Sequence, residues 1–214
     1  MLELGVKLLI AYLLGTLLGS LLLGRLRGVD IRNLGSGNAG ATNALRTQGK
    51  LFGSLVLILD IAKGWFAVWW LPGAVFSGIG LDPELPRPWL TIACGFAVIV
   101  GHVYPVWFDF RGGKGAATVA GVIAAVDPRL ILPLLLSWFI VLVLTGFVGL
   151  ATMLSGVAIV AVVIVLEPHN VPLLSFCLGV TGFLIYTHRG NIARMRAGQE
   201  NRVRRLWLFR SRTA

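Results

Sequence analysis

The stretch VGLATMLSGVAIVAVVIVL, residues 148–166, contains no charged side chain. A helix of about 20 apolar residues crosses the hydrocarbon core of a bilayer. Similar runs recur along the chain of 214 residues, of which 57% are hydrophobic and only 13% charged, against about 25% charged residues in soluble domains. The sequence therefore predicts an all-α integral membrane protein. Because the apolar runs leave no room for a separate soluble domain, we interpret residues 1–214 as a single transmembrane domain.

Seven transmembrane helices are expected, at 4–24, 51–71, 89–107, 113–126, 130–146, 148–166 and 171–188. The first is interpreted as a retained helix, because it lacks the basic start and small-residue cleavage site of a signal peptide. The fourth has about 14 residues, or roughly 21 Å, which is short of a hydrocarbon core near 30 Å. Its N-terminus is therefore expected inside the protein, near membrane depth.

Basic residues gather on one side of this topology. Seven spans place the termini on opposite sides, and the segments after spans one, three, five and seven then share a face. That face holds 15 of the 19 Lys and Arg residues: Arg25, Arg27, Arg32, Arg46, Lys50, Arg111, Lys114, Arg189, Arg194, Arg196, Arg202, Arg204, Arg205, Arg210 and Arg212. Positive loops favour the cytoplasmic side, which predicts an outside N-terminus and a cytoplasmic C-terminus.

The same asymmetry accounts for the net charge of +10 without nucleic acid as a partner. The tail 194–212 interrupts its arginines with Trp207, Leu208 and Phe209. Such a segment is predicted to rest on anionic lipid headgroups.

Three polar segments interrupt the apolar runs. The first reads GSGNAGATNALR at 35–46, the second reads GHVYP at 101–105 and GGKGAAT at 112–118, and the third begins THRGNIAR at 187–194. All three are expected on the same face of the membrane. Cationic, glycine-rich backbone with many hydrogen-bond donors at one membrane face predicts a site for an anionic substrate.

The first polar segment alternates glycine with small polar residues. Glycines let backbone N–H groups approach an anion closely, and Ser36, Asn38, Thr42 and Asn43 add side-chain hydrogen bonds. Arg46 adds a planar guanidinium suited to phosphate. The alternative is a flexible, solvated loop.

The second polar segment is similar to a phosphate-binding loop, with Lys114 among Gly112, Gly113 and Gly115. It is not a Walker A motif, because Gly115 follows the lysine where that motif has Ser or Thr. Open backbone N–H groups and a helix beginning at about residue 114 would still favour phosphate. The alternative is a packing motif of small residues, for which Gly121 is a further candidate.

The remaining polar residues of the spans have mainly structural interpretations. Asp60 and Lys63 are three residues apart and can pair on one helix face, holding helices together. His102 is interpreted first as a structural hydrogen-bonding residue, with a functional role as the alternative. Cys94 and Cys177 lie in apolar runs and are interpreted as small buried hydrophobic residues.

The third polar segment places His188 beside Arg189, Asn191 and Arg194. A histidine there can act as a general base, orient a substrate or bind an anion. Glu200 follows closely and could neutralise one of the arginines, although a surface role is an equal alternative.

Together, the three segments resemble the bacterial acyl-phosphate:glycerol-3-phosphate acyltransferases, the PlsY family. The first motif of that family is similar to Gly-Ser-Gly-Asn-x-Gly-Ala-Thr-Asn-x-x-Arg, matched at 35–46. The second resembles Gly-His-x-x-Pro with Phe-x-Gly-Gly-Lys-Gly-x-Ala-Thr, matched at 101–105 and 110–118. The third resembles Thr-His-Arg-x-Asn-Ile-x-Arg with Gly-x-Glu, matched at 187–194 and 198–200. The similarity also covers LDIAKG at 59–64.

One stretch departs from the resemblance. Near the start of the sixth span, relatives look like Arg-Tyr-x-Ser-Leu, whereas this chain reads GFVGL at 146–150. Two polar contacts would then be absent, and Thr145 or Thr152 would be the substitutes.

The resemblance implies transfer of an acyl group from acyl phosphate to the sn-1 hydroxyl of glycerol 3-phosphate. Lysophosphatidic acid and phosphate would form at the cytoplasmic face of the bacterial inner membrane, in the first acylation of phospholipid synthesis, with no thioester as direct donor. The glycine loop 112–115 would hold the acyl phosphate, and Lys114, His188 and Asn191 would be catalytic. Glycerol 3-phosphate would be bound by Ser36, Asn38, Thr42, Asn43, Arg46, Lys114, His188 and Asn191.

Two other functions compete with this one: an anion or phosphate-ester transporter, and a non-enzymatic lipid-binding or scaffold protein. The outer loops are poor in binding residues, which disfavours the transporter, and a scaffold leaves the three segments unexplained. An acyl-CoA type of acyltransferase would use His-x4-Asp, but Trp107, Leu174 and Ala193 stand at the aspartate positions. Because the chain shows no Cys/His metal spacing, we expect no metal and no cofactor.

Overall fold

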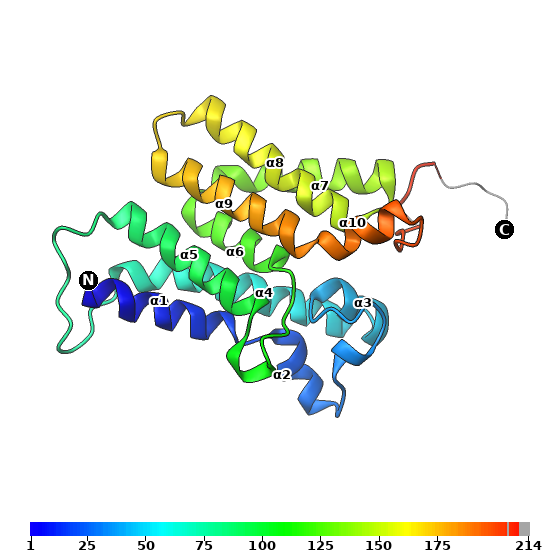
Figure 1. Ribbon diagram of the computed structural model, residues 1–214, viewed down its shortest axis with the longest axis horizontal. Coiled ribbons are helices and arrows are strands. Elements are labelled where there is room, and N and C mark those ends of the chain that lie inside the picture. Colours follow the sequence, from blue (N-terminus) through cyan, green and yellow to red (C-terminus); the bar gives the residue numbers. More distant parts are fainter. Residues whose placement is uncertain (205, 210–214) are drawn as a thin grey trace. The chain divides into compact units, whose positions relative to one another are not determined.

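The computed structural model describes residues 1–204 and 206–209. Arg205, Arg210 and Arg212 of the predicted basic tail lie outside the described residues. The chain falls into two compact units, Met1–Pro128 and Arg129–Ala214, and each is described by itself; the single-domain interpretation stays a prediction. The described residues form helices and no named strand, so the all-α class is confirmed (Figure 1).

The first unit contains six α-helices and three short 3-10 helices. They are α1 (Leu2–Gly15), α2 (Gly19–Leu26), η1 (Ile31–Asn33), α3 (Ala41–Gln48), α4 (Lys50–Trp70), η2 (Leu71–Gly73), α5 (Arg87–Val103), η3 (Val106–Phe108) and α6 (Ala116–Val126). α1 packs against α5, while α4 packs against α3, α5 and α6.

The expected single helix at 4–24 is wrong in one respect, because the structure breaks it. α1 ends at Gly15 and α2 begins at Gly19, with a bend of 46° between them. Leu18 has extended backbone angles, and the Thr16 hydroxyl donates to the Leu13 carbonyl at 2.6 Å. Broken backbone at membrane depth needs internal hydrogen-bond partners, and here the ammonium of Lys63 donates to the carbonyls of Gly15 and Leu17, each at 3.0 Å.

Glycines form the helix crossings of the first unit. Gly15 of α1 faces Gly101 of α5, and a Cβ on either would overlap a backbone carbonyl of the other helix. Gly64 of α4 and Gly121 of α6 form a second crossing of the same kind, against the carbonyls of Thr118 and Ile61. Small residues allow membrane helices to approach closely in the absence of a hydrophobic driving force. The predicted packing role of Gly121 is therefore confirmed.

The fourth expected span is shorter than predicted. α6 begins at Ala116 rather than at about residue 114, and has 11 residues, a length of about 16 Å. Gly115 precedes it in a left-handed conformation, with φ of 88°. Among the described residues, four helices are long and apolar enough to cross a membrane, or up to six if each bent pair is one span. The count of seven and the orientation of the termini stay predictions.

The second unit contains η4 (Pro128–Leu130) at its start, then α7 (Ile131–Thr145), α8 (Val148–Leu166), α9 (Val171–Thr187) and α10 (Arg189–Arg196). α8 packs against both α7 and α9. Gly156 lets α8 approach α9, because a Cβ there would lie 2.9 Å from the Thr181 hydroxyl. Asn170 caps α9 by accepting a hydrogen bond from the Leu173 amide at 3.2 Å. α9 and α10 meet at a bend of 52°.

Replacing Gly121 with alanine should lower the thermal unfolding midpoint of the purified protein, because overpacking at a helix contact costs about 1–3 kcal/mol. The matched control is Gly5→Ala in α1, where a Cβ meets nothing within 4 Å; there alanine should be neutral or mildly stabilising. Equal midpoints for the two variants would contradict the crossing.

Candidate functional site

The loop of the first polar segment is folded around the Asn43 side chain, which is only 1% exposed. Its amide nitrogen lies 2.9–3.0 Å from the carbonyls of Ile31, Leu34 and Asn38, and its oxygen accepts from the Ser36 amide at 3.0 Å. The amide is thus occupied by its own loop. We assign Asn43 to shaping the segment, whereas direct substrate contact by this residue was the expectation from sequence.

Tight backbone turns complete this loop. Gly35 and Gly37 have φ of 57° and 72°, conformations that favour glycine. The hydroxyl of Ser20 in α2 donates to the Ala39 carbonyl at 2.7 Å, which ties the loop to the helix after the break. The loop then enters α3, a helix that the sequence did not predict.

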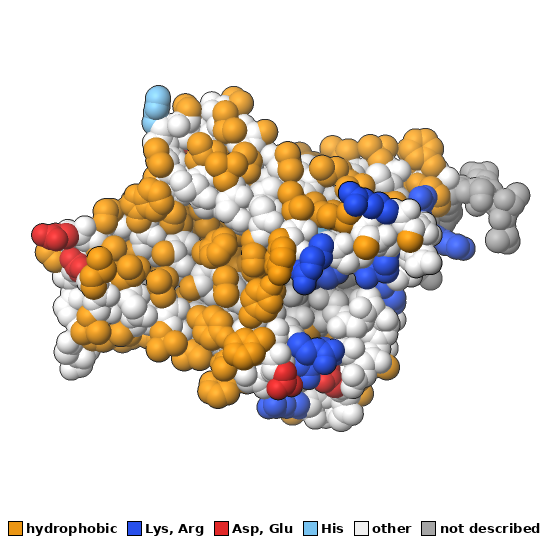
Figure 2. Space-filling model, viewed as in Figure 1, with side chains coloured by type: hydrophobic (Ala, Val, Ile, Leu, Met, Phe, Trp, Pro, Cys, Tyr) orange, Lys and Arg blue, Asp and Glu red, His pale blue; other side chains and the backbone are white. Residues whose placement is uncertain are grey.

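Three of the candidate side chains of this segment are exposed. Ser36, Thr42 and Arg46 lie at the surface, and Asn38 is half-buried. Basic side chains of the first unit gather around α2 in Figure 2, whereas hydrophobic side chains cover the flank of α1 and α5. The exposed hydroxyl and guanidinium groups are therefore the ones available to a ligand.

Arg32 connects the first polar segment to the second. Its guanidinium forms a two-point ion pair with Asp30, at 2.7 Å and 3.1 Å, and donates to the Phe108 carbonyl at 3.0 Å. The hydrogen bonds from Arg32 hold the pKa of the Asp30 carboxyl below its ordinary value. Phe108 also belongs to a buried cluster that includes Ala39 and Ala44 of the first segment and Ile31, which precedes it. The two polar segments of the first unit therefore lie side by side.

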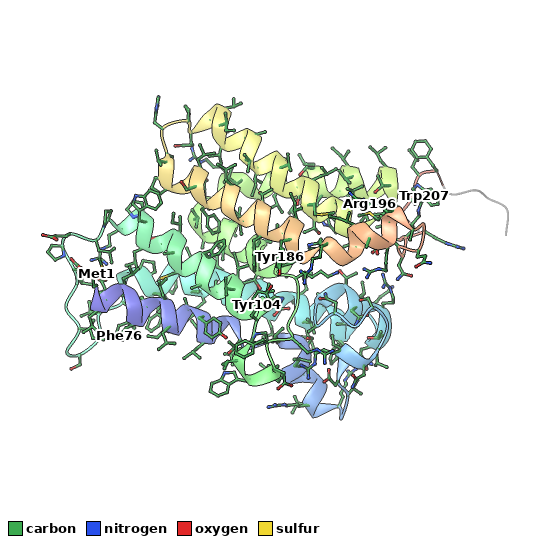
Figure 3. All side chains as sticks on the ribbon, in the orientation of Figure 1. Met1, Phe76, Tyr104, Tyr186, Arg196 and Trp207 are labelled. Carbon is green, nitrogen blue, oxygen red and sulfur yellow. The ribbon has the colours of Figure 1, made fainter. Side chains whose placement is uncertain are left out.

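The second polar segment turns back on the end of α5. Asp109 and Phe110 both have φ of 56°, which is uncommon for residues other than glycine. Beyond them, the amides of Gly112 and Gly113 donate to the carbonyls of Val103 and His102, each at 3.1 Å. Figure 3 labels Tyr104 at this end of α5, where its carbonyl accepts from the Tyr12 hydroxyl at 2.8 Å.

These hydrogen bonds correct the expectation of open amides throughout the glycine loop. The N–H groups of Gly112 and Gly113 are used within the protein. The first N–H groups of α6, from Ala116 onward, have no acceptor within the helix, and Lys114 lies half-buried beside them. The N–H groups that the helix leaves open are thus those from Ala116 onward, slightly later in the chain than predicted.

Asp60, Lys63 and His102 form a buried cluster below this loop. The Lys63 ammonium lies 2.9 Å from Asp60 Oδ1 and 2.9 Å from His102 Nδ1. The predicted Asp60–Lys63 pair is confirmed, as is a structural hydrogen-bonding role for His102.

His188 stands between α9 and α10 in the second unit and is 5% exposed. Its Nδ1 lies 2.8 Å from the Leu184 carbonyl, which can only accept, so Nδ1 carries a hydrogen. The neutral ring therefore has its lone pair on Nε2. This tautomer is the one that a base acting through Nε2 requires.

Glu200 organises the third polar segment. One carboxylate oxygen accepts from Asn191 Nδ2 at 2.7 Å, and the other accepts from Arg194 Nε at 2.6 Å. The prediction that Glu200 neutralises an arginine is confirmed. Asn191 packs on Gly149, where a Cβ would lie 3.0 Å from its amide.

The stretch 146–150, which departs from the resemblance, packs against residues 202, 203 and 207 near the C-terminus. The Arg202 guanidinium stacks on Phe147 at 4.5 Å and on Trp207 at 4.1 Å, and Trp207 lies beyond the end of α10 in Figure 3. The amide of Val203 donates to the Gly146 carbonyl at 2.8 Å.

The two proposed polar substitutes in this stretch serve their own helices. Thr145 and Thr152 donate to the carbonyls of Val141 and Val148. Among the described residues, no group of three or more His, Cys, Asp and Glu side chains is placed to hold a metal ion.

Comparisons with known proteins identify the family. Residues 6–198 match the family model described as glycerol-3-phosphate acyltransferase. The chain belongs to the glycerol-3-phosphate acyltransferase family. It is an integral membrane acyltransferase that acts on glycerol 3-phosphate, and phospholipid biosynthesis follows from the family.

Individual relatives cover nearly the whole chain. The glycerol-3-phosphate acyltransferase of Aquifex aeolicus is 38% identical over 90% of this chain and 95% of its own length. The Burkholderia vietnamiensis protein of the same name is 41% identical over 91% and 88%. A crystal structure of PlsY (YgiH), an integral membrane glycerol 3-phosphate acyltransferase in its glycerol 3-phosphate form, is similar with a TM-score of 0.81 at 34% identity, covering 93% of this chain and 94% of that one.

Membership of this acyltransferase family confirms the resemblance drawn from the sequence, and no observation favours a transporter or a scaffold. The sequence did not identify Arg32 and Ser20, which hold the first polar segment, or Arg202, which packs on the stretch 146–150. Arg32 carried a local signal, since Asp30 stands two residues before it. For Arg202, Trp207 five residues later was a local signal, whereas Phe147 is remote in the chain.

Replacing Asn43 with aspartate should open the first polar segment, because a carboxylate would face three carbonyl oxygens. We expect faster hydrogen exchange over residues 34–43 and a fall in kcat/KM of at least about tenfold, since an unsatisfied buried polar group costs ~1–3 kcal/mol. The control is Gln48→Glu, the same change of charge at the end of α3. Unchanged exchange in the Asn43 variant would contradict the assigned role.

Proposed function

We propose that this acyltransferase uses acyl phosphate as its donor and acylates the sn-1 hydroxyl of glycerol 3-phosphate. The products are 1-acylglycerol 3-phosphate and inorganic phosphate, in the first acylation of phospholipid synthesis. The reaction takes place at the cytoplasmic face of the bacterial inner membrane. The polar segments share their predicted face with most of the basic residues, and basic loops favour the cytoplasmic side.

The observation that carries this proposal is the pair of adjacent polar segments in the first unit. Arg32 and the cluster around Phe108 join the segments. One segment presents Ser36, Thr42 and Arg46, and the other presents Lys114 and the start of α6. Two neighbouring anion-binding segments suit two phosphate-bearing substrates. A thioester donor has no phosphate next to its reacting carbonyl, whereas an acyl phosphate does.

Each segment has a proposed part in binding. Ser36, Thr42 and Arg46, with Asn38 beside them, bind glycerol 3-phosphate, and Asn43 holds their loop. The start of α6, which follows the glycine loop, presents its first N–H groups to the acyl phosphate, and the Lys114 ammonium attracts both phosphates as a point charge. His188 and Asn191 are the proposed catalytic residues, together with Lys114.

The reaction needs no enzyme nucleophile. The sn-1 hydroxyl oxygen attacks the acyl carbonyl carbon, the new ester C–O bond forms, and the anhydride C–O bond breaks to release phosphate. Charge develops on the carbonyl oxygen and on the leaving phosphate, so fixed cationic groups and N–H donors lower the barrier. The hydroxyl proton passes to His188 Nε2 or to a substrate phosphate oxygen.

The donor is tested with purified protein, glycerol 3-phosphate and three donors in parallel: palmitoyl phosphate, palmitoyl-CoA and palmitoyl acyl carrier protein. We expect lysophosphatidate only with palmitoyl phosphate, because only that donor carries phosphate at the reacting carbon. Product from the thioesters alone would overturn the donor assignment, and the folded state of the sample is checked by gel filtration.

Replacing His188 by alanine and by glutamine tests the base. We expect the alanine variant to lose about 10²-fold in kcat, the lower range for a general base, and the glutamine variant to lose less, because its amide still offers a hydrogen bond. Near-normal turnover in either variant excludes His188 as an indispensable base, leaving a substrate phosphate to take the proton.

A further inference from the structure

The Asp60–Lys63–His102 cluster is deeply buried within a membrane-spanning unit. The exposed fractions are 1% for Asp60, 9% for Lys63 and 2% for His102. The three groups meet through one atom each: Asp60 Oδ1 lies 2.9 Å from Lys63 Nζ and 3.6 Å from His102 Nδ1. Buried charges are costly in a membrane protein and often mark functional positions.

The cluster reaches the break between α1 and α2. Lys63 donates to the carbonyls of Gly15 and Leu17, and Asp60 Oδ1 accepts from the Gly19 amide at 3.4 Å. These contacts fix where α2 begins. α2 in turn holds the first polar segment through the hydrogen bond from Ser20 to the Ala39 carbonyl.

The cluster also reaches the glycine loop. The polar contacts of the His102 ring with Asp60 and Lys63 pass through Nδ1, and the Nε2 edge of the ring packs on Gly113, where a Cβ would overlap Nε2. The backbone carbonyl of the same His102 accepts from the Gly113 amide at 3.1 Å.

We propose that Asp60, Lys63 and His102 are positioning residues that hold both polar segments of the first unit in the geometry that binds the substrate phosphates. The cluster fixes the α1–α2 break with one side and the glycine loop with the other. It contacts no substrate itself. The proposal rests on the proposed function only in its assignment of the two segments to phosphate-bearing substrates.

A second buried ion cluster in the same unit provides a matched comparison. Lys7 and Glu3 are 1% and 2% exposed, and the Lys7 ammonium donates to Glu3 at 2.7 Å and to the Pro72 carbonyl at 2.9 Å. Arg87 also pairs with Glu3. The chemistry is the same, with a buried lysine that donates to a carboxylate and to a backbone carbonyl. These contacts, however, join α1, η2 and α5 and involve neither polar segment.

The experiment compares two double variants made of near-isosteric neutral residues: Asp60→Asn with Lys63→Met, and Glu3→Gln with Lys7→Met. Removing both charges avoids an unpaired buried charge, so both proteins should remain folded. Thermal unfolding, hydrogen exchange by mass spectrometry, and kcat and KM for each substrate are measured on both. Gly113→Ala serves as the reference for a disturbed glycine loop.

For Asp60→Asn with Lys63→Met, we expect exchange to rise about tenfold at residues 15–19 and again at 112–115, because both segments lose their common anchor. KM should rise about tenfold for whichever substrate has a raised KM in Gly113→Ala, with kcat changed less than about threefold. The Glu3→Gln with Lys7→Met protein should keep wild-type KM values and wild-type exchange in both regions.

Wild-type KM values in the Asp60→Asn with Lys63→Met protein would overturn the positioning role, as would an equal rise in exchange in both double variants. Failure of the donor assignment gives a different result: the wild type itself would then show no turnover with palmitoyl phosphate. In that case the exchange data and equilibrium binding of glycerol 3-phosphate still decide whether the cluster positions the two segments.

Discussion

The structure of the first unit depends on satisfying the backbone where α1 breaks into α2. In the bilayer, carbonyls released by such a break find no water. Lys63 donates to two of them, those of Gly15 and Leu17, and Asp60 balances its charge. A chain with an ordinary apolar residue at position 63 would have to continue the helix, and the first polar segment would then leave α2 at a different height and angle.

Glycine has two separate tasks in this protein, and both concern close approach. Gly15, Gly64, Gly101 and Gly121 bring helix backbones together in the interior. The His102 ring instead packs against the Cα of Gly113. This close approach lets the loop run antiparallel to the end of α5, with backbone hydrogen bonds between the two. Glycines therefore serve close packing both between helices and within the loop, where the sequence offered packing and phosphate binding as alternatives for residues 112–115.

The helices were predictable from sequence because an apolar run in a bilayer has few structural options. The break at 16–18 was not, because Thr16, Leu17 and Leu18 fit a helix and the cause of the break lies in Lys63, far along the chain. The occupied amide of Gly112 was missed for the same reason. The same holds for the site. Residue types and their spacing identified the polar segments, but which hydrogen-bond donors face outward depends on contacts between residues distant in sequence.

This dependence on distant contacts bears on how the family motif should be interpreted. In the first polar segment, the Asn43 side chain forms its hydrogen bonds within its own loop, while Ser36 and Arg46 remain exposed. In the third, Glu200 is occupied by Asn191 and Arg194. Some motif residues therefore hold the loops in shape, whereas others are exposed and available to a ligand. A reaction that needs only two oriented anions and a proton acceptor requires rigid loops more than it requires many catalytic side chains.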